Sequence, residues 1–578
     1  MFQSLYKLRG FFKRYKTNQI LAVFFLLISY FVTFSKPYLI GRISDSIVTG
    51  DFDENQFYTM LGLFGLLIFL TYFINVGWSF NLFKNIYLIS RDTRNQLMAK
   101  YLKQFPKFFE KNSTGSLMGK ATNDIEAMSG IVGYGVMCIF DAIIYPVVLL
   151  TVMAFISWQL TLFTLIALPP FIYILYKTNF KMEEKFRKLQ ESFDKMNDIT
   201  LESISSIKAV RAFNVEHVFK DRFRNHILAN RDADMEKNSI QQVYMPYSTV
   251  FNTILMSMSI LGGVFLINQG QMTIGSLVTF TMYMGNLAWP AFALSDFLTM
   301  GSEGKTSIKR IEDILDYEED IKDIENPVIL KDINNFSLKN LYFKYPTSDR
   351  EILKDINLDF KKGETVIIVG KTGSGKSTLL KQFMRLYDID SGELEINNIP
   401  IENYERYSLI EKIAYVPQEN YLFSRSIRDN IKLFRDFSDV EIEKAAILSD
   451  FKKDLDNFPK GLDTMTGEKG VALSGGQRQR IALSRALIKE SEILILDDVF
   501  SAVDTKTEEN IINNLEVERK GKTNIFATHR LSVIKPEDHI VVLEDGHIEA
   551  QGNHMEVYNS SKWYKEQFDI QFMEVSHE

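Results

Sequence analysis

The chain has 578 residues and 46% of them are hydrophobic, yet its mean hydropathy of −0.06 is close to zero. A chain of this length exceeds one compact core, so we expect at least two domains, one in a membrane and one soluble. The net charge of −7 argues against a nucleic-acid partner. The single cysteine, Cys138, excludes an internal disulfide and a multi-cysteine metal site.

Residues 1–16 are basic and amphipathic, and the apolar run that follows is too long for the core of a typical signal peptide. We therefore expect an N-terminal elbow segment on the cytoplasmic side. Apart from Asp141, no charged side chain interrupts residues 127–176, and none interrupts 238–295. A membrane-crossing helix needs about 20 apolar residues. The pattern predicts a transmembrane domain over 17–304 with six spans, at about 18–41, 56–83, 131–156, 158–178, 243–267 and 273–297.

Basic residues set the predicted orientation of these spans. The N-terminal segment and segments 84–126 and 177–237 carry five, eight and thirteen Lys and Arg, whereas the opposite loops carry only Lys36 and Arg42. Lys and Arg in short loops mark the cytoplasmic side. Both termini are therefore expected in the cytoplasm, with the chain integral to a membrane, in our interpretation a bacterial plasma membrane.

The two long cytoplasmic segments are predicted to continue as paired helices. Their tips are expected at 108–115, which includes Phe109, and at 210–216, which includes Phe213. Exposed aromatic residues at a helix turn favour a contact role for these tips. The simpler alternative is that both are surface turns.

Residues 305–335 are polar and are predicted to be a linker, and 336–578 carry an α/β pattern. An apolar strand at 365–369 leads into a glycine loop and then a helix, the context that marks a phosphate-binding loop. Glycines free the backbone N–H groups to wrap phosphates, and the helix N-terminus favours their charge. Lys376 is expected on the β/γ-phosphates of ATP and Ser377 on Mg²⁺. The predicted loop is Gly370, Lys371, Thr372, Gly373, Ser374, Gly375, Lys376, Ser377 and Thr378.

Two further motifs complete the nucleotide chemistry. A second apolar strand, 493–496, ends at Asp497 and Asp498, and a carboxylate at that position beside a phosphate loop holds Mg²⁺. Between the loop and this strand, a glycine pair opens a helix and forms a second phosphate-facing surface. One chain does not need two such surfaces for one nucleotide, so the second is expected to face the ATP of another molecule. Its residues are Leu473, Ser474, Gly475, Gly476 and Gln477.

With LSGGQ at 473–477 ahead of Asp497, the chain resembles an ATP-binding cassette (ABC) exporter half-transporter, whose signature this is. The resemblance covers essentially the whole chain. It implies a multidomain fold: an all-α, six-helix transmembrane domain of the type I exporter kind, followed by an α/β P-loop nucleotide-binding domain. It also implies ATP and Mg²⁺ as cofactors, the lipid bilayer as surroundings and a second half-transporter as partner.

The resemblance assigns roles to further residues. Tyr345 matches the aromatic that stacks on adenine, although a core aromatic is the alternative. Gln418 matches the glutamine that touches Mg²⁺ and the coupling loops. His529 matches the switch histidine on the γ-phosphate. The loop that crosses between two cassettes corresponds to Ser501, Ala502, Val503 and Asp504.

Asp498 departs from the family pattern, in which a Glu at this position orients or deprotonates the attacking water. Asp is one methylene shorter, and a misplacement of about 1 Å can cost on the order of 10²-fold in rate. The site is expected to bind ATP and hydrolyse it poorly, unless a relaxed backbone makes the change harmless. The chain thus resembles the degenerate-site subunit of bacterial heterodimeric multidrug exporters, whose partner is expected to carry the Glu.

The sequence indicates the transported compound less clearly than it indicates the ATP site. Met and aromatic side chains in the spans suit hydrophobic or amphipathic compounds, which favours multidrug efflux, although most of them are expected in packing. Asp141 and Asp296 are candidate substrate contacts because a charge inside a span is costly. Asp141 could equally pair with a basic residue or lie below the bilayer. Alternatives are a homodimeric lipid or drug flippase, a heterodimeric exporter of a thiol or haem-related metabolite, and an ATP sensor without transport.

Overall fold

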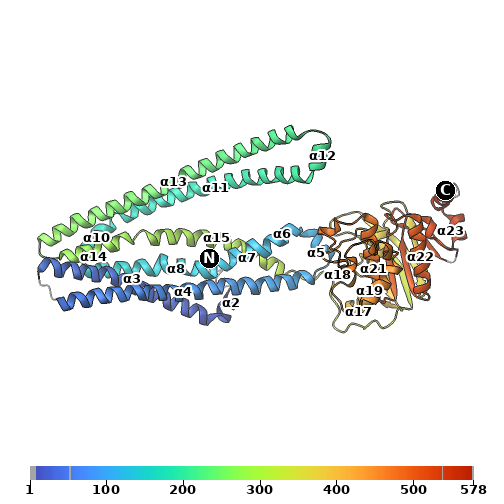
Figure 1. Cartoon of the computed structure of the whole chain (residues 1–578), viewed down its shortest axis with the longest axis horizontal. Helices are drawn as coiled ribbons and strands as arrows, with labels where there is room; N and C mark the ends of the chain where they lie inside the picture. The colour runs from blue at the N-terminus through green and yellow to red at the C-terminus, as the bar shows by residue number, and fades with distance from the viewer. Residues whose placement is uncertain (1–7, 51–53, 537, 576–578) are drawn as a thin grey trace. The chain divides into compact units, whose positions relative to one another are not determined.

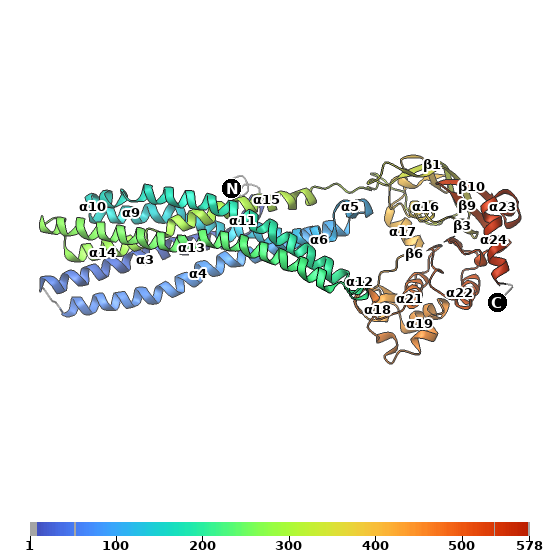
Figure 2. The ribbon, with the colours of Figure 1, turned by 90° about the horizontal axis from the view of Figure 1, so that it is seen from above.

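The structure is a computed structural model that describes residues 8–50, 54–536 and 538–575. The chain forms two compact units (Figures 1 and 2). Unit 1 comprises Met1–Tyr101 and Gly115–Tyr317, and unit 2 comprises Leu102–Thr114 and Glu318–Glu578. The first seven residues of the predicted elbow lie outside the described residues.

Apart from short turns between its helices, the described part of unit 1 is helical. Long helices run alongside one another, and α11 and α13 form an extended hairpin with α12 at its tip (Figure 1). The helix Thr114–Ile156 is interrupted by three π-helical turns. The elements are α2 (Arg9–Arg14), α3 (Lys16–Thr49), α4 (Glu54–Leu102), α6 (Thr114–Gly119), η1 (Lys120–Asp124), α7 (Ile125–Gly130), η2 (Ile131–Gly135), α8 (Val136–Ile139), η3 (Phe140–Ile144), α9 (Tyr145–Ile156), α10 (Trp158–Leu165), α11 (Leu168–Ser205), α12 (Ile207–Ala212), α13 (Glu216–Asn268), α14 (Ile274–Gly285) and α15 (Trp289–Leu315).

Among the described residues, four helical segments are long and apolar enough to cross a membrane, and two more are apolar but shorter. The four are Lys16–Thr49, Glu54–Leu102, Thr114–Ile156 and Thr249–Asn268, and the shorter two are Trp158–Ile174 and Ile274–Gly285. The predicted spans 158–178 and 273–297 are therefore not single helices. Pro169 and Pro290 sit in the first turns of α11 and α15. Proline lacks the N–H that would continue the preceding helix, so each segment breaks there. Six crossings stay a prediction.

The predicted linker begins later than the sequence indicates. Residues 305–315 belong to α15, which ends at Leu315. Ile308, Ile311 and Ile314 recur at a spacing of three and are all buried, so one face of this charged helix is packed. Because residues 305–335 are polar overall, their composition predicted a linker and not the helical spacing of these three isoleucines.

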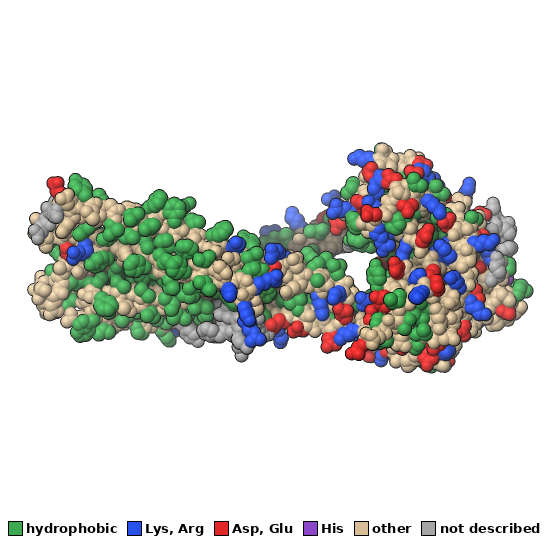
Figure 3. All heavy atoms as spheres, turned by 90° about the horizontal axis from the view of Figure 1, so that it is seen from below, with side chains coloured by type: hydrophobic (Ala, Val, Ile, Leu, Met, Phe, Trp, Pro, Cys, Tyr) green, Lys and Arg blue, Asp and Glu red, His purple; other side chains and the backbone are tan. Residues whose placement is uncertain are grey.

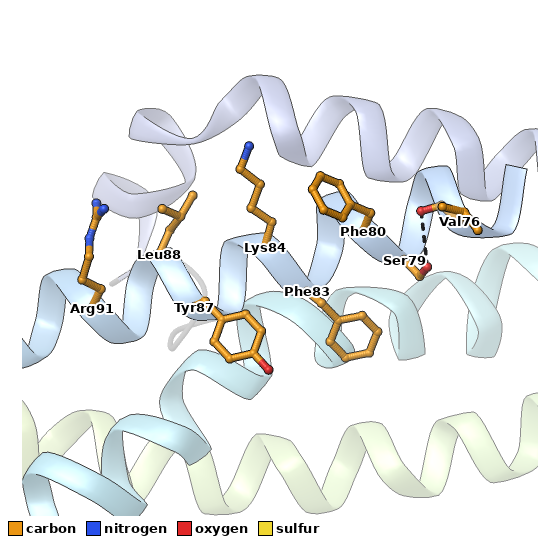
Figure 4. Close-up of a pocket in the computed structure, with 8 residues that line it drawn as sticks. All are labelled: Val76, Ser79, Phe80, Phe83, Lys84, Tyr87, Leu88 and Arg91. Carbon is orange, nitrogen blue, oxygen red and sulfur yellow. Dashed lines mark hydrogen bonds between the residues drawn. The ribbon is translucent and has the colours of Figure 1, made fainter. Parts of the chain in front are cut away.

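On the face that Figure 3 shows, hydrophobic side chains cover much of unit 1, whereas charged side chains of both signs are spread over unit 2. One exposed stripe lies on α4, where Val76, Phe80, Phe83 and Tyr87 recur every three or four residues (Figure 4). They line a groove of about 720 Å³, which Lys84 also borders. A stripe of this kind packs against lipid or against a helix of another chain.

Small residues let α3 and α14 approach closely. Gly41 and Gly275 face one another, and Thr279 donates a hydrogen bond to the Pro37 carbonyl at 3.2 Å. Asp45 accepts a hydrogen bond from the Gly275 N–H at 2.6 Å. A methyl group at Gly275 would collide with the Gly41 carbonyl and with Asp45. Backbone contact between apolar helices depends on such small residues.

We expect Gly275→Ala to lower stability by about 1–3 kcal/mol, the usual cost of overpacking. Thermal unfolding of the detergent-purified chain measures the loss. Gly285→Ala, at the end of the same helix with open space around it, is the matched control. Equal behaviour of the two variants would contradict the packing argument.

Unit 2 contains two sheets. In its described residues, a four-stranded antiparallel sheet has the order β2-β1-β4-β5, and a six-stranded sheet has the order β10-β9-β3-β8-β7-β6. The strands are β1 (Asn335–Lys344), β2 (Glu351–Lys361), β3 (Thr365–Gly370), β4 (Ser391–Ile396), β5 (Ile399–Pro400), β6 (Ile413–Val416), β7 (Ile493–Asp497), β8 (Thr523–Ala527), β9 (His539–Glu544) and β10 (His547–Gly552). The helices used below are α5 (Pro106–Lys111), α16 (Lys376–Phe383), α17 (Arg406–Lys412), α21 (Gly475–Leu487), α22 (Thr505–Glu518), α23 (His554–Ser560) and α24 (Lys562–Val575).

The six-stranded sheet positions the site. Strands β9, β3, β8, β7 and β6 are parallel, and only β10 runs antiparallel at the edge. Residues 366–369 of β3 are fully buried, as expected for a central strand covered on both faces. The carboxyl ends of parallel strands meet at one edge, where open α/β sheets bind ligands. The loops after β3, β6, β7 and β8 therefore gather there.

Candidate functional site

The loop after β3 has the geometry of an anion cradle. Gly370, Gly373 and Gly375 have φ of 151°, 83° and 109°, which glycine adopts without strain. A methyl group at Gly370 would collide with the Leu543 carbonyl. The Ser374 hydroxyl is buried, with no hydrogen-bond partner among the described residues. Glycines, an unpartnered hydroxyl and the N-terminus of α16 together fit the phosphates of ATP.

Lys376 and Ser377 lie at the start of α16. The Lys376 ammonium donates to the Gly370 and Lys371 carbonyls at 2.8 and 3.0 Å. Burial lowers the pKa of Lys376, although Asp498 and Asp497 favour its charge. A cation held inside the loop is positioned to meet an anion, and a triphosphate supplies that charge.

Asp497 is the metal candidate. Its carboxylate is buried and accepts hydrogen bonds from Ser377 at 2.8 Å and from the Tyr415 hydroxyl at 3.3 Å. Burial raises the pKa of Asp497, and these two bonds oppose the rise. The described residues contain no group of three or more His, Cys, Asp or Glu that could hold a metal. A hydroxyl beside one carboxylate fits Mg²⁺, which keeps waters and takes phosphate oxygens as ligands.

Asp498 follows in a strained position, with φ 50°. Its carboxylate oxygen lies 2.8 Å from Nδ1 of His529, whose side chain is half exposed. Its N–H donates to the Ala527 carbonyl at 2.8 Å. Its carbonyl accepts from Gln479 at 3.3 Å and from Ser501 at 2.9 Å. The structure therefore brings Asp498 and His529 together and fixes the backbone of Asp498 on both sides.

The signature residues open α21. The Ser474 hydroxyl accepts from the Gln477 N–H at 3.3 Å, and the Gln477 side chain returns a bond to the Ser474 N–H at 3.0 Å, a capping box. Ser474 and Gly475 are exposed, and Leu473 is buried. A methyl group at Gly476 would lie 2.9 Å from the Ala502 carbonyl. Gly476 is therefore needed for close packing against residues 501–504 as well as for an open surface.

Residues 501–504 connect β7 to α22. Val503 is buried, and Asp504 caps α22 by accepting from the Thr507 N–H at 2.9 Å and from its hydroxyl at 2.8 Å. These Thr507 bonds lower the pKa of Asp504. Gln418, in the loop after β6, is exposed. The loop 501–504 is thus fixed at its C-terminal end.

Tyr345 lies at the end of β1, half buried. Its ring meets those of Phe343 and Tyr387 edge-on, at centroid distances of 5.1 and 5.3 Å. Its hydroxyl lies 3.0 Å from the Thr378 hydroxyl. The ring therefore packs on the core, and its hydroxyl lies beside the phosphate loop, whereas stacking on adenine stays a prediction.

The two candidate substrate contacts lie in unit 1. Asp141, in η3, is buried and accepts hydrogen bonds from the Tyr30 hydroxyl and from the Trp289 indole, the latter at 3.0 Å. Its observed partners are neutral donors, so the predicted alternative of a basic partner is wrong for the described contacts. Asp296 is exposed and accepts from the Tyr134 hydroxyl at 3.2 Å. Substrate contact by either stays a prediction.

Tyr387 connects the site to α5, and no sequence motif marks this residue. Glu110 on α5 accepts a hydrogen bond from Tyr387 at 2.5 Å, and Arg406 stacks over Phe105 at 4.6 Å. Burial, followed by the Glu110 bond, raises the pKa of Tyr387. Tyr387 in turn packs on Tyr345. The first predicted tip therefore contacts the nucleotide-binding region, and no motif in the sequence indicated which residues it would meet.

Comparison with known proteins gives matches along the whole chain. Residues 19–291 match the family model of the ABC transporter transmembrane region, and residues 353–501 match the family model described as ABC transporter. A probable multidrug resistance ABC transporter ATP-binding/permease protein of Bacillus subtilis (strain 168), YheI, is 36% identical over 100% of this chain and 99% of its own length. The multidrug resistance-like ATP-binding protein MdlA of Escherichia coli (strain K12) is 32% identical, covering 99% of this chain and 97% of that protein.

Two further similarities are informative. The ATP-dependent lipid A-core flippase of Syntrophus aciditrophicus (strain SB) is 32% identical over 95% of this chain and 91% of that protein. The solved structure of a bacterial Atm1-family ABC exporter with ATP bound superposes with a TM-score of 0.79 and 25% identity, covering 96% of this chain and 98% of that one. The fold is therefore that of a type I exporter transmembrane domain fused to an α/β nucleotide-binding domain.

We expect Tyr345→Ala to weaken ATP binding about tenfold, because base stacking on an aromatic ring is worth roughly 1–3 kcal/mol. Tyr345→Phe keeps the ring and should change affinity less than about twofold. Equilibrium binding of a fluorescent ATP analogue measures both. Tyr407→Ala, at an exposed tyrosine on α17, is the control. An unchanged affinity for Tyr345→Ala would assign the ring to the core alone.

Proposed function

Because the chain belongs to the ABC transporter family that fuses a transmembrane region to an ATP-binding domain, we propose that it is one half of a heterodimeric exporter in a bacterial plasma membrane. The exporter moves hydrophobic or amphipathic compounds outward and is powered by ATP. The site on this chain binds ATP with Mg²⁺ and hydrolyses it poorly. Bound ATP and Mg²⁺ would supply the phosphoryl group and its charge neutralisation.

Asp498 is the observation that carries this proposal. A family enzyme uses a Glu here, and Asp holds its carboxylate about one methylene further from the phosphate side, a displacement that can cost on the order of 10²-fold in rate. The carboxylate is also engaged by His529 at 2.8 Å. A carboxylate that holds the switch histidine is less available to a water.

The backbone around Asp498 supports the same proposal. A shift of the chain toward the phosphates would restore the reach of a shorter side chain. Hydrogen bonds to Ala527, Gln479 and Ser501 hold both peptide groups of Asp498. Each would have to be lengthened, and an unpaired buried group costs about 1–3 kcal/mol. A relaxed backbone therefore does not easily compensate for the missing methylene.

The signature supports a second chain. Ser474 and Gly475 are exposed at the N-terminus of α21, with the capping box intact. In our proposal this surface completes the ATP site of the partner, which carries the Glu. The partner's signature completes the site formed by Lys376 and Asp497. The described hydrogen bonds of Ser474 and Gln477 run within α21 and to Asp454, which leaves the exposed backbone free for that role.

Two exposed apolar surfaces support reciprocal docking between chains. At the tip of the α11–α13 hairpin, Phe213 is 77% exposed, and Ile207 on α12 is also exposed. In unit 2, a cluster of exposed aromatic rings, Tyr421, Phe423 and Phe434, follows the Gln418 loop. We propose that α12 of each chain docks on the aromatic cluster of the other. Burying such rings on both sides would stabilise the pair.

The relatives favour a broad apolar cargo. Two are named as multidrug resistance proteins, and a third as a lipid A-core flippase. The second candidate function is therefore a lipid flippase that works as a homodimer. It predicts two equivalent sites, whereas Asp498 predicts unequal ones. Export of a thiol or haem-related metabolite is a narrower version of the heterodimer proposal.

Substitution at 498 tests the unequal sites in the complex purified with its native partner. Asp498→Glu should restore this site and raise total ATPase at most about twofold, because only one of two sites gains its 10²-fold. Asp498→Asn should leave total ATPase almost unchanged. Replacing the partner's carboxylate at the corresponding position should abolish it. Steady-state phosphate release measures all three.

The ATPase activity of this chain expressed without a partner can contradict the proposal. Vigorous ATPase from the isolated chain that is unaffected by Asp498→Asn would contradict a degenerate site in a heterodimer. Vigorous ATPase that Asp498→Asn abolishes would instead support a homodimer with two equivalent sites, as the flippase alternative requires.

The contact between α5 and Tyr387 generates a separate prediction. Tyr387→Phe keeps the ring and removes the donor to Glu110, at a cost of about 1–3 kcal/mol. ATP binding should persist. Dye uptake into inside-out vesicles should fall relative to the amount of ATP hydrolysed, because α5 would no longer transmit the cassette's movement. Tyr558→Phe, which removes a 2.8 Å bond to Asp569 on α24, is the matched control. Parallel loss of uptake and hydrolysis would show that α5 does not transmit the cassette's movement.

A further inference from the structure

The switch loop is held by a residue from the far end of the chain. Gln571 on α24 accepts a hydrogen bond from the Leu531 N–H at 2.8 Å through its side-chain oxygen. Through its side-chain nitrogen it donates to the His529 carbonyl at 3.1 Å. One amide therefore holds the backbone immediately before and after Arg530. The side-chain amide of Gln571 thus donates one hydrogen bond to this loop and accepts one from it, as the backbone of a neighbouring strand would.

The orientation of the amide is fixed by its partners. A backbone N–H can only donate and a carbonyl can only accept, so a flipped amide would face two like groups. Only a side chain with one donor and one acceptor at this reach satisfies both. Glutamine has both, and an ionised glutamate has acceptors alone.

The helix that carries Gln571 is itself anchored. Tyr564 on α24 is fully buried, in the same hydrophobic cluster as Leu531 and Val503. Its hydroxyl lies 2.9 Å from Nδ1 of His554, and the His554 ring lies 4.6 Å from that of Phe568. These contacts hold α24 in place, and with it the side-chain amide of Gln571.

We propose that Gln571 is a positioning residue for the switch histidine. Among the residues that the structure describes, no strand pairs with the loop after β8 at His529, and the ring of His529 is half exposed. Gln571 fixes the two peptide groups that flank Arg530, directly after His529, and Asp498 holds the His529 ring at Nδ1. With Nδ1 engaged, Nε2 is the atom left to reach a γ-phosphate. The C-terminal helix therefore sets how well this site retains ATP, an inference that rests on the proposed role of His529.

The experiment measures retention of ATP on this chain within the full complex. A photoreactive radiolabelled ATP analogue is bound, chased with unlabelled ATP, crosslinked at intervals and read on the band of this chain. We expect Gln571→Leu to shorten the retention half-time about tenfold, the size expected when a charge-assisted hydrogen bond is weakened. Gln567→Leu, one turn earlier on the same helix, is the matched control and should retain the analogue as the native chain does.

A double variant tests whether Gln571 acts through His529. His529→Ala should shorten retention at least as much as Gln571→Leu, and the two together should do no more than His529→Ala alone. Additive effects would overturn the inference and leave the role of His529 intact. If His529→Ala itself changes nothing, the proposed role of the histidine fails, whatever Gln571 does.

Gln571→Glu adds a readout that misfolding would not produce. Protonated glutamate has one donor and one acceptor and imitates glutamine, whereas ionised glutamate repels the His529 carbonyl. The ratio of variant to native retention should therefore rise as pH falls from 7 toward about 5, where a glutamate begins to be protonated. A ratio independent of pH would assign Gln571 to stability alone. A midpoint of thermal unfolding that is several degrees lower for Gln571→Leu than for the native chain would do the same.

Discussion

The parallel register of β3, β8 and β7 is the constraint on which the nucleotide chemistry depends. Val366 pairs with Ile525, and Asp497 pairs with Ala527, so three loops leave the sheet at one edge. The loop after β3 leads to Lys376, Asp498 follows β7, and His529 follows β8. Backbone hydrogen bonds within the sheet and burial of β3 on both faces fix their spacing. A chain that lost this register would keep its motifs and lose the site.

Much of this arrangement could be predicted from the sequence because each motif has a local physical cause. Gly370, Gly373 and Gly375 have positive φ, which glycine adopts most readily. The strands before Lys376 and Asp497 are predicted by their apolar composition. The family resemblance, the two-domain fold and the membrane-embedded half are confirmed by the comparisons. The roles of the individual site residues, the heterodimer and the weak site stay proposals.

What the sequence could not predict depends on contacts between distant segments. The partners of Asp141 come from α3 and α15, more than a hundred residues away on either side, and nothing local marks Tyr30 or Trp289. The amide of Gln571 lies 42 residues beyond the loop it holds. The helical start of the predicted linker failed for another reason, because three isoleucines among many charges give a weak composition signal even though their spacing is regular.

The boundary between the two units passes through a helix. The boundary crosses the backbone at three places, after Tyr101, after Thr114 and after Tyr317. The first crossing lies inside α4, a single helix from Glu54 to Leu102. α4 therefore carries the chain from one unit into the other as continuous helical backbone, and only its last residue, Leu102, belongs to unit 2.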